Sequence, residues 1–116
     1  MDGHVTDAFR LLLREAQNIA RVVLDGFAIQ NIEDPSEQVQ VAAVTNFCYA
    51  IEFIWNPSEQ VQLTAVTQNG NAIDYIKGPS EALQLAAVTQ YGAAIQYIED
   101  PSEAVKLAAQ RSKSHA

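Results

Sequence analysis

The sequence has very little of the residues on which enzymes and metal sites most often depend. Its 116 residues contain one cysteine and two histidines. A single cysteine, Cys48, excludes an intramolecular disulfide and is typical of a reducing compartment. His4 and His115 are isolated, so there is no metal-ligand spacing, no nucleophile with a paired base and no glycine-rich phosphate loop. These absences predict a protein that is not an enzyme and that holds no metal and no cofactor.

Long apolar runs and basic residues are also scarce. No stretch of about 18 apolar residues could span a bilayer, and acids precede the first apolar stretch, unlike in a signal peptide. We therefore expect a soluble cytoplasmic protein with no membrane partner. Between Asp25 and Glu103 there are eleven acidic residues, and Lys77 is the one basic residue. Because phosphates need a basic footprint, direct nucleic-acid binding is not expected.

What the sequence does have is a repeat of 22 residues. A Pro-Ser-Glu motif begins at Pro35, Pro57, Pro79 and Pro101. The string after each motif recurs with small changes, and it includes an A-V-x-x-x-G-x-A-I pattern such as A-V-T-Q-N-G-N-A-I at residues 65–73. A period this regular predicts an array of similar structural units.

Each unit is predicted to form two helices. Proline favours the first helical position, so the residue before it, such as Asn56, should be the N-cap, and the glutamate three positions later completes a capping box. The first helix should end near Gly70 and Gly92 in the left-handed conformation that glycine adopts easily. A second helix of about two turns follows. The recurring serines then belong to the first helical turn: Ser36, Ser58, Ser80 and Ser102.

These units predict an all-α fold: a small right-handed stack of helix-turn-helix repeats, similar to an α-solenoid, with a longer N-terminal capping helix. A pair of short helices cannot bury its own apolar face, so stacked copies must share one core. Both ends are expected to be caps that face solvent. Residues 1–116 form one domain, divided into a capping helix (5–25), a partial repeat (26–34), full repeats (35–56, 57–78 and 79–100), a C-terminal capping helix (101–110) and a basic tail (111–116).

The N-terminal capping helix is predicted to be amphipathic. Its apolar residues are spaced to form one stripe. They are Phe9, Leu12, Leu13, Ala16, Ile19 and Val23.

The recurring A-V-x-x-x-G-x-A-I core resembles the short bihelical repeats of a family of uncharacterised function found in phage and bacterial proteins. The resemblance covers about residues 26–110, and its motif consists of core, capping and turn residues. It therefore implies a fold and no catalytic or binding residue. It also implies a phage or bacterial setting, in which small acidic proteins often inhibit host defence, including CRISPR complexes.

Positions at which one unit departs from its siblings are the candidates for a binding site. Phe47, Tyr49 and Trp55 stand where the other units are mostly polar or small. Because clustered aromatics are typical of binding hot spots, these three residues are predicted to anchor a partner. The acids Glu52 and Asp74 are predicted to attract it. The alternative is that the three aromatic residues pack beneath the N-terminal helix.

Two further positions have structural interpretations. Cys48 occupies the place of Gly70 and Gly92 with no cation nearby, so we expect a buried and inert thiol. The aromatic residues that recur in every unit are expected to form a half-buried ladder: Phe53, Tyr75 and Tyr97.

Two functions are compatible with this sequence. The first is a non-catalytic acidic protein that docks on a protein with a basic surface, such as a nucleic-acid-binding complex of bacterial defence, and inhibits it. Eleven acids along the array are too few to imitate duplex DNA, which carries about one charge per 1.7 Å of axis. The second is a self-assembly module, in which the aromatic patch or an incompletely capped end forms a homodimer or a longer stack.

Overall fold

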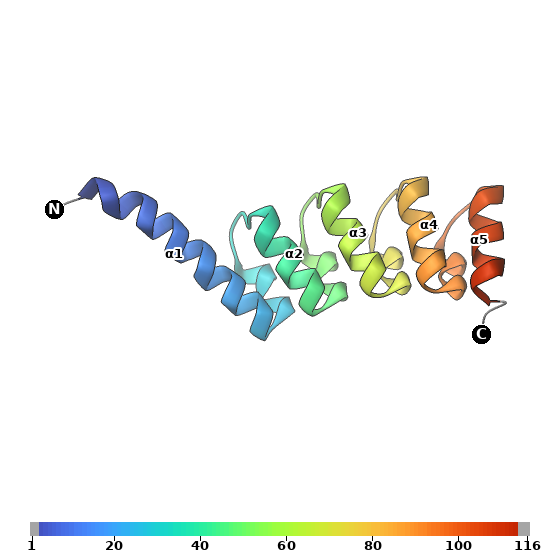
Figure 1. Cartoon of the computed structure of the whole chain (residues 1–116), viewed down its shortest axis with the longest axis horizontal. Helices are drawn as coiled ribbons and strands as arrows, with labels where there is room; N and C mark the ends of the chain where they lie inside the picture. The colour runs from blue at the N-terminus through green and yellow to red at the C-terminus, as the bar shows by residue number, and fades with distance from the viewer. Residues whose placement is uncertain (1–2, 114–116) are drawn as a thin grey trace.

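The chain folds as a row of short helices. The computed structural model describes residues 3–113, which contain helices and no strand, so the predicted all-α fold is confirmed. Long and short helices alternate along the chain (Figure 1). In order they are α1 (Gly3–Leu24), η1 (Gly26–Asn31), α2 (Glu37–Asn46), η2 (Cys48–Phe53), α3 (Glu59–Gln68), η3 (Gly70–Tyr75), α4 (Glu81–Gln90), η4 (Gly92–Tyr97) and α5 (Glu103–Lys113).

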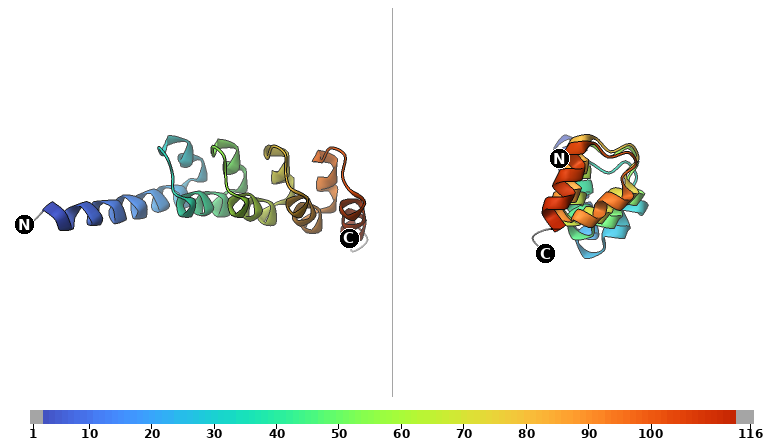
Figure 2. Two further views of the ribbon diagram at one scale, coloured as in Figure 1. Left: turned by 90° about the horizontal axis from the view of Figure 1, so that it is seen from above. Right: turned by 90° about the vertical axis from the view of Figure 1, so that its right-hand side faces the viewer.

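The helices stack along one axis. Helices α2 to α5 stand side by side, and the short η helices form a second row beside them (Figures 1 and 2). The molecule measures 64 × 23 × 19 Å, and its radius of gyration of 17.3 Å exceeds the roughly 13 Å of a compact domain of this length. Within residues 3–113, each unit contacts only the units before and after it. Stability therefore depends on contacts between nearest neighbours.

The core between neighbouring units is entirely apolar. In each of α2, α3 and α4 a valine or leucine, such as Val61, and an Ala-Val pair, such as Ala65 and Val66, are fully buried. The alanine keeps the helix narrow, so that the next helix packs closely against it. Among the residues that the structure describes, no polar or charged side chain is buried. Apolar burial between units is thus the main stabilising contribution.

Each repeated long helix begins at the serine, so the predicted N-cap was wrong by two residues. Ser80 has extended backbone angles, and its Oγ accepts a hydrogen bond from the N–H of Leu83, 3.1 Å away. The same hydroxyl donates to Glu59 of the preceding unit at 2.8 Å. The recurring glutamate is therefore the first helical residue and not the third, and no capping box forms. Glu59 and Glu81 join their units to the serine of the next unit.

The left-handed residues also lie elsewhere than expected. They directly precede the prolines and make the turn into the next unit: Asp34, Asn56, Gly78 and Asp100, with φ between 50° and 57°. The glycines predicted to be left-handed, Gly70 and Gly92, do not have positive φ. At Gly70 the cause of the glycine is space, because a Cβ there would overlap the carbonyl oxygen of Ala87 in the next unit.

The second helix of each unit is a 3-10 helix. Its bonds join residues three apart, as in Ala72 N–H to the Asn69 carbonyl at 2.9 Å and Ile76 N–H to the Ile73 carbonyl at 3.1 Å. With three residues per turn, residues three apart share one side of the helix. Gly70, Ile73 and Ile76 are accordingly all buried. This side packs against the long helices.

The first unit is a full repeat, where a partial one at 26–34 was expected. Glu15 lies 22 residues before Glu37, and its carboxylate accepts a bond from Ser36 at 2.5 Å, as Glu59 does from Ser80. Residues 15–24 of α1 therefore correspond to a repeat helix. The helix continues back to Gly3 because Leu13 stands where the other units have the proline that precedes the N-cap. The resulting overhang projects beyond the stack (Figure 1).

The two ends of the stack are exposed, and their helices depart from the expected bounds. The N-terminal end is apolar and open, since Leu12 and Leu24 of α1 are 71% and 86% exposed. At the other end, α5 extends to Lys113, so residues 111–113 of the predicted basic tail are helical and residues 114–116 lie outside the described residues. Ser112 occupies the place of Gln90 in the repeat, and both accept a bond from a glycine N–H of the preceding η helix, at 3.1 Å and 2.7 Å.

The close approach at Gly70 generates a prediction. Gly70→Ala should lower the free energy of unfolding by about 1–3 kcal/mol, because the added methyl group forces the next unit away. Thermal and urea unfolding followed by circular dichroism measure it. Gly78→Asn is the matched control, since Asn56 has the same left-handed conformation and open space surrounds Gly78. Equal stability of Gly70→Ala and wild type would contradict the packing argument.

Candidate protein-binding site

Trp55 is the most exposed large apolar side chain of the repeat array. It is 93% exposed and follows η2 in the turn that leads to α3. The same position holds Glu33, Lys77 and Glu99 in the other units. A tryptophan normally buries most of its large surface. The Trp55 side chain instead leaves almost all of its surface in solvent and contributes almost no buried area to the core.

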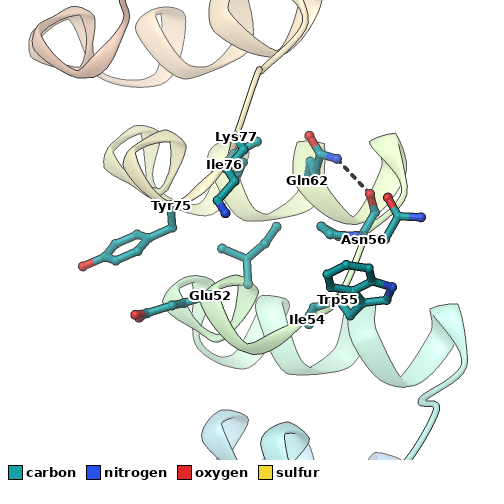
Figure 3. A pocket seen from close by; sticks show the side chains of 10 residues that line it. Glu52, Ile54, Trp55, Asn56, Gln62, Tyr75, Ile76 and Lys77 are labelled. Carbon is teal, nitrogen blue, oxygen red and sulfur yellow. Dashed lines mark hydrogen bonds between the residues drawn. The ribbon is translucent and has the colours of Figure 1, made fainter.

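A groove of about 410 Å³ lies beside Trp55, between η2 and η3. Figure 3 shows Trp55 on one side of it, Glu52 and Tyr75 on the other, and Ile54 and Ile76 between them. Lys77 also lines the groove. The groove therefore combines an apolar floor and aromatic walls with charges at its rim.

The turn below Trp55 is fixed by a repeated hydrogen bond. The side-chain amide of Gln62 donates to the Pro57 carbonyl at 2.8 Å, as drawn in Figure 3. Gln40 and Gln84 make the same bond to their own prolines. Trp55 therefore projects into solvent from a turn whose conformation is fixed by a hydrogen bond.

A second hollow, of about 360 Å³, lies on the opposite side of Trp55. It is formed by η1, η2 and the turn before α2, and it includes Ile32, Phe53 and Asp34. Trp55 therefore separates two hollows, one with the carboxylate of Glu52 and the other with that of Asp34. Both carboxylates are on exposed residues.

Phe47 and Tyr49 belong to a different arrangement. Their rings pack edge to face at 5.7 Å, Phe47 packs on Phe27 at 4.5 Å, and Tyr49 packs on Tyr75 at 5.2 Å. The Tyr49 hydroxyl accepts a hydrogen bond from Asn69 at 3.1 Å, and burial raises the pKa of Tyr49. These contacts join η1, η2 and η3, so the two rings connect neighbouring units.

The structure therefore divides the predicted site. It brings Trp55 and Glu52 together in one groove. Phe47 and Tyr49 lie instead among the edge-to-face ring contacts that join η1, η2 and η3. Asp74 is exposed on η3 and does not line the groove. Packing beneath the N-terminal helix does not describe these residues, because the ring contacts of Phe47 are with η1 and η2. The residues expected as a half-buried ladder are partly exposed, by 38–44%: Phe53, Tyr75 and Tyr97.

Two groups of acids differ in their contacts. Glu15, Glu59 and Glu81 accept bonds from the serine of the next unit and have a structural role. A second group has no ion pair or hydrogen bond of its side chain within the described part of the chain. It consists of Glu33, Asp34, Glu37, Glu52, Asp74, Glu99, Asp100 and Glu103, all exposed. These eight carboxylates form the accessible negative surface.

Cys48 is buried, and its thiol has no feature of a nucleophile. Burial raises the pKa of Cys48, and the weaker effect of backbone hydrogen bonds lowers it. Among residues 3–113 no three His, Cys, Asp or Glu side chains gather where they could hold a metal ion. No described helix has the length and apolar character that crossing a membrane requires.

Comparison with protein-family models, curated proteins and solved structures finds no match. The site is therefore defined by its own geometry. Sequence reasoning missed Asp34 and Lys77 as neighbours of Trp55. The 22-residue period places them one unit before and one unit after it, and only the stacking of units shows that they line the hollows.

Burial of Cys48 generates a prediction. At pH 8 the native thiol should react with Ellman's reagent at least about tenfold more slowly than the unfolded chain, because burial and the raised pKa reduce access and thiolate. Absorbance at 412 nm follows the reaction. A Trp55→Cys, Cys48→Ala variant is the matched control and should react rapidly. Equal rates for the native and unfolded forms of Cys48 would contradict burial.

Proposed function

We propose that this chain is a non-catalytic binding protein that docks on a protein with a basic surface through Trp55 and the carboxylates beside it. The observation that carries the proposal is the exposure of Trp55, which the scaffold does not need. Exposed aromatic residues next to hollows are typical anchors of protein interfaces.

The chemistry around Trp55 suits an arginine side chain of the partner. A guanidinium group can stack on an indole face and at the same time donate hydrogen bonds to a carboxylate. Glu52 supplies such a carboxylate in one hollow, and Asp34 supplies one in the other. Because Lys77 at the rim of the first groove would repel a cation, the arginine is expected to enter the second hollow.

The remaining exposed acids support long-range attraction. The eight unpaired carboxylates lie along the array on both sides of Trp55. Charges of one sign accelerate the encounter with an oppositely charged partner, more strongly at low salt. Partners with basic surfaces include nucleic-acid-binding complexes, and the repeat resemblance directs attention to those of bacterial defence, such as CRISPR surveillance complexes. Docking would block such a surface and inhibit the complex.

Self-assembly is the second candidate function. The observation that favours it is the apolar surface of α1, where Phe9 and Leu12 are 60% and 71% exposed. This surface is separate in sequence from Trp55, and each can be removed without changing the other.

A binding experiment tests the first candidate. Immobilised wild-type protein should capture basic proteins from a bacterial lysate, identified by mass spectrometry, and Trp55→Ala should lose them. Against a purified captured partner, Trp55→Ala should raise the off-rate about 30-fold, the equivalent of about 2 kcal/mol. The double variant Glu52→Lys, Asp74→Lys should slow the on-rate and reduce its salt dependence. Surface plasmon resonance measures both rates.

Leu107→Ala is the matched control, because Leu107 is an exposed leucine on α5 at the other end of the array. It should bind as wild type does. Unchanged capture by Trp55→Ala together with a lower melting temperature would show that Trp55 serves stability and would refute the proposal.

A further inference from the structure

We propose that the part of the partner bound at Trp55 is an extended segment in the polyproline II conformation. An arginine of this segment occupies the second hollow, and an apolar residue three positions away occupies the first groove. The inference rests on the proposed function and adds to it the conformation and residue pattern of what is bound. Asp34 and Lys77 are the residues that set this pattern.

The two hollows are one feature of the scaffold, repeated in successive units. Each residue that lines the second hollow has its counterpart 22 positions later in the lining of the first groove. Ile32 corresponds to Ile54 on the floor, and Phe53 corresponds to Tyr75 on the wall. Trp55 lines both, because it stands between them. The array therefore offers two similar receptacles that are one unit apart.

The charges at the rims of the two receptacles differ. In the second hollow Asp34 is the charged residue of the lining. In the first groove its counterpart is the neutral Asn56, and Glu52 and Lys77 contribute one charge of each sign. Lys77 forms no ion pair with the described residues, so its ammonium group is free to repel a cation. The second hollow thus suits an arginine, and the isoleucine floor of the first groove suits an apolar side chain.

The other charges near Asp34 do not oppose a cation there. Asp34 also lines a third hollow, beside α1, together with Arg14, Glu15 and Glu33. Arg14 does not form an ion pair with Asp34. Because the carboxylates around this hollow outnumber the single arginine, the surroundings of Asp34 remain negative.

The separation of the receptacles selects the conformation of the segment. Packed helices lie about 8–10 Å apart, so equivalent points of successive units are separated by roughly this distance. A polyproline II segment has three residues per turn and rises about 3.1 Å per residue, so residues three apart point the same way and lie about 9 Å apart. A β-strand would point them to opposite faces. An α-helix, about 10–12 Å wide, would rest on the projecting ring of Trp55.

Polar and aromatic groups beside the receptacles suit the backbone of such a segment. Polyproline II has no internal hydrogen bonds, so its carbonyl groups are free to accept them. Asn56 is exposed beside Trp55, and its amide can donate to one peptide group and accept from another (Figure 3). The rings of Phe53, Trp55 and Tyr75 give the walls the aromatic character on which polyproline II segments dock.

Selection of displayed peptides on the full chain tests the proposal. From a library of random linear peptides, wild type should select sequences with a basic residue and an apolar residue three positions apart. Trp55→Glu should lose these peptides and keep the melting curve of wild type, because Glu33 and Glu99 hold this position in other units. The selection also gives the direction of the segment, which is written below as Arg-x-x-Leu.

Two substitutions that the repeat itself supplies separate the two peptide positions. Glutamate stands at the Lys77 position in other units, and Asn56 has the left-handed conformation of Asp34, so Lys77→Glu and Asp34→Asn should both fold normally. Lys77→Glu should raise the affinity for Arg-x-x-Arg at least about tenfold and change that for Arg-x-x-Leu little. Asp34→Asn should lower the affinity for both peptides about tenfold. Fluorescence anisotropy with labelled peptides measures these affinities.

Several results would overturn the inference. They are selected peptides without a fixed spacing, apolar residues at the helical intervals of three, four and seven, and effects of both substitutions at the same peptide position. Failure to select any linear peptide would also overturn it, and Trp55-dependent capture from lysate would then identify a folded surface as the partner. If Trp55→Glu bound the selected peptides as wild type does, the docking proposal itself would fail. Peptides that depend on Trp55 but lack the pattern would refute this inference alone.

Discussion

The fit of one unit against the next is the constraint on which this structure depends. A unit of two short helices buries little surface of its own. The buried residues therefore lie where the two helices of one unit meet or where adjacent units meet. The fit is close enough that Gly70 must lack a side chain and that Ala65 and Ala87 keep the long helices narrow. The elongated shape follows, because contacts are confined to the units before and after.

The same constraint explains most of the polar residues that recur. The serine caps its own helix and binds the glutamate of the preceding unit, and the glutamine closes the turn onto the proline carbonyl. Glu15, Glu59 and Glu81 are therefore part of the scaffold. What the scaffold leaves unexplained is small: the exposed ring of Trp55, eight unpaired carboxylates and the apolar surface of α1.

Those remaining features occur in separate parts of the molecule. Trp55 and its two hollows lie on the array, whereas the exposed apolar residues of α1 lie at the N-terminal end of the stack. A linear stack allows this separation, since a change in one unit reaches only its neighbours.

The sequence by itself determined the all-α class, the period of 22 residues and the unusual character of Trp55, because helix signals and repeats are local and can be compared between units. It did not show that Ser80, and not Gly78, caps its helix, because both are good N-cap residues and only the fold places Gly78 in the left-handed turn before the proline. Nor did it show that Trp55 and Glu52 share a groove that excludes Phe47. Those facts depend on contacts between units, about 20 residues apart in the chain, which only the packing of complete helices brings within reach.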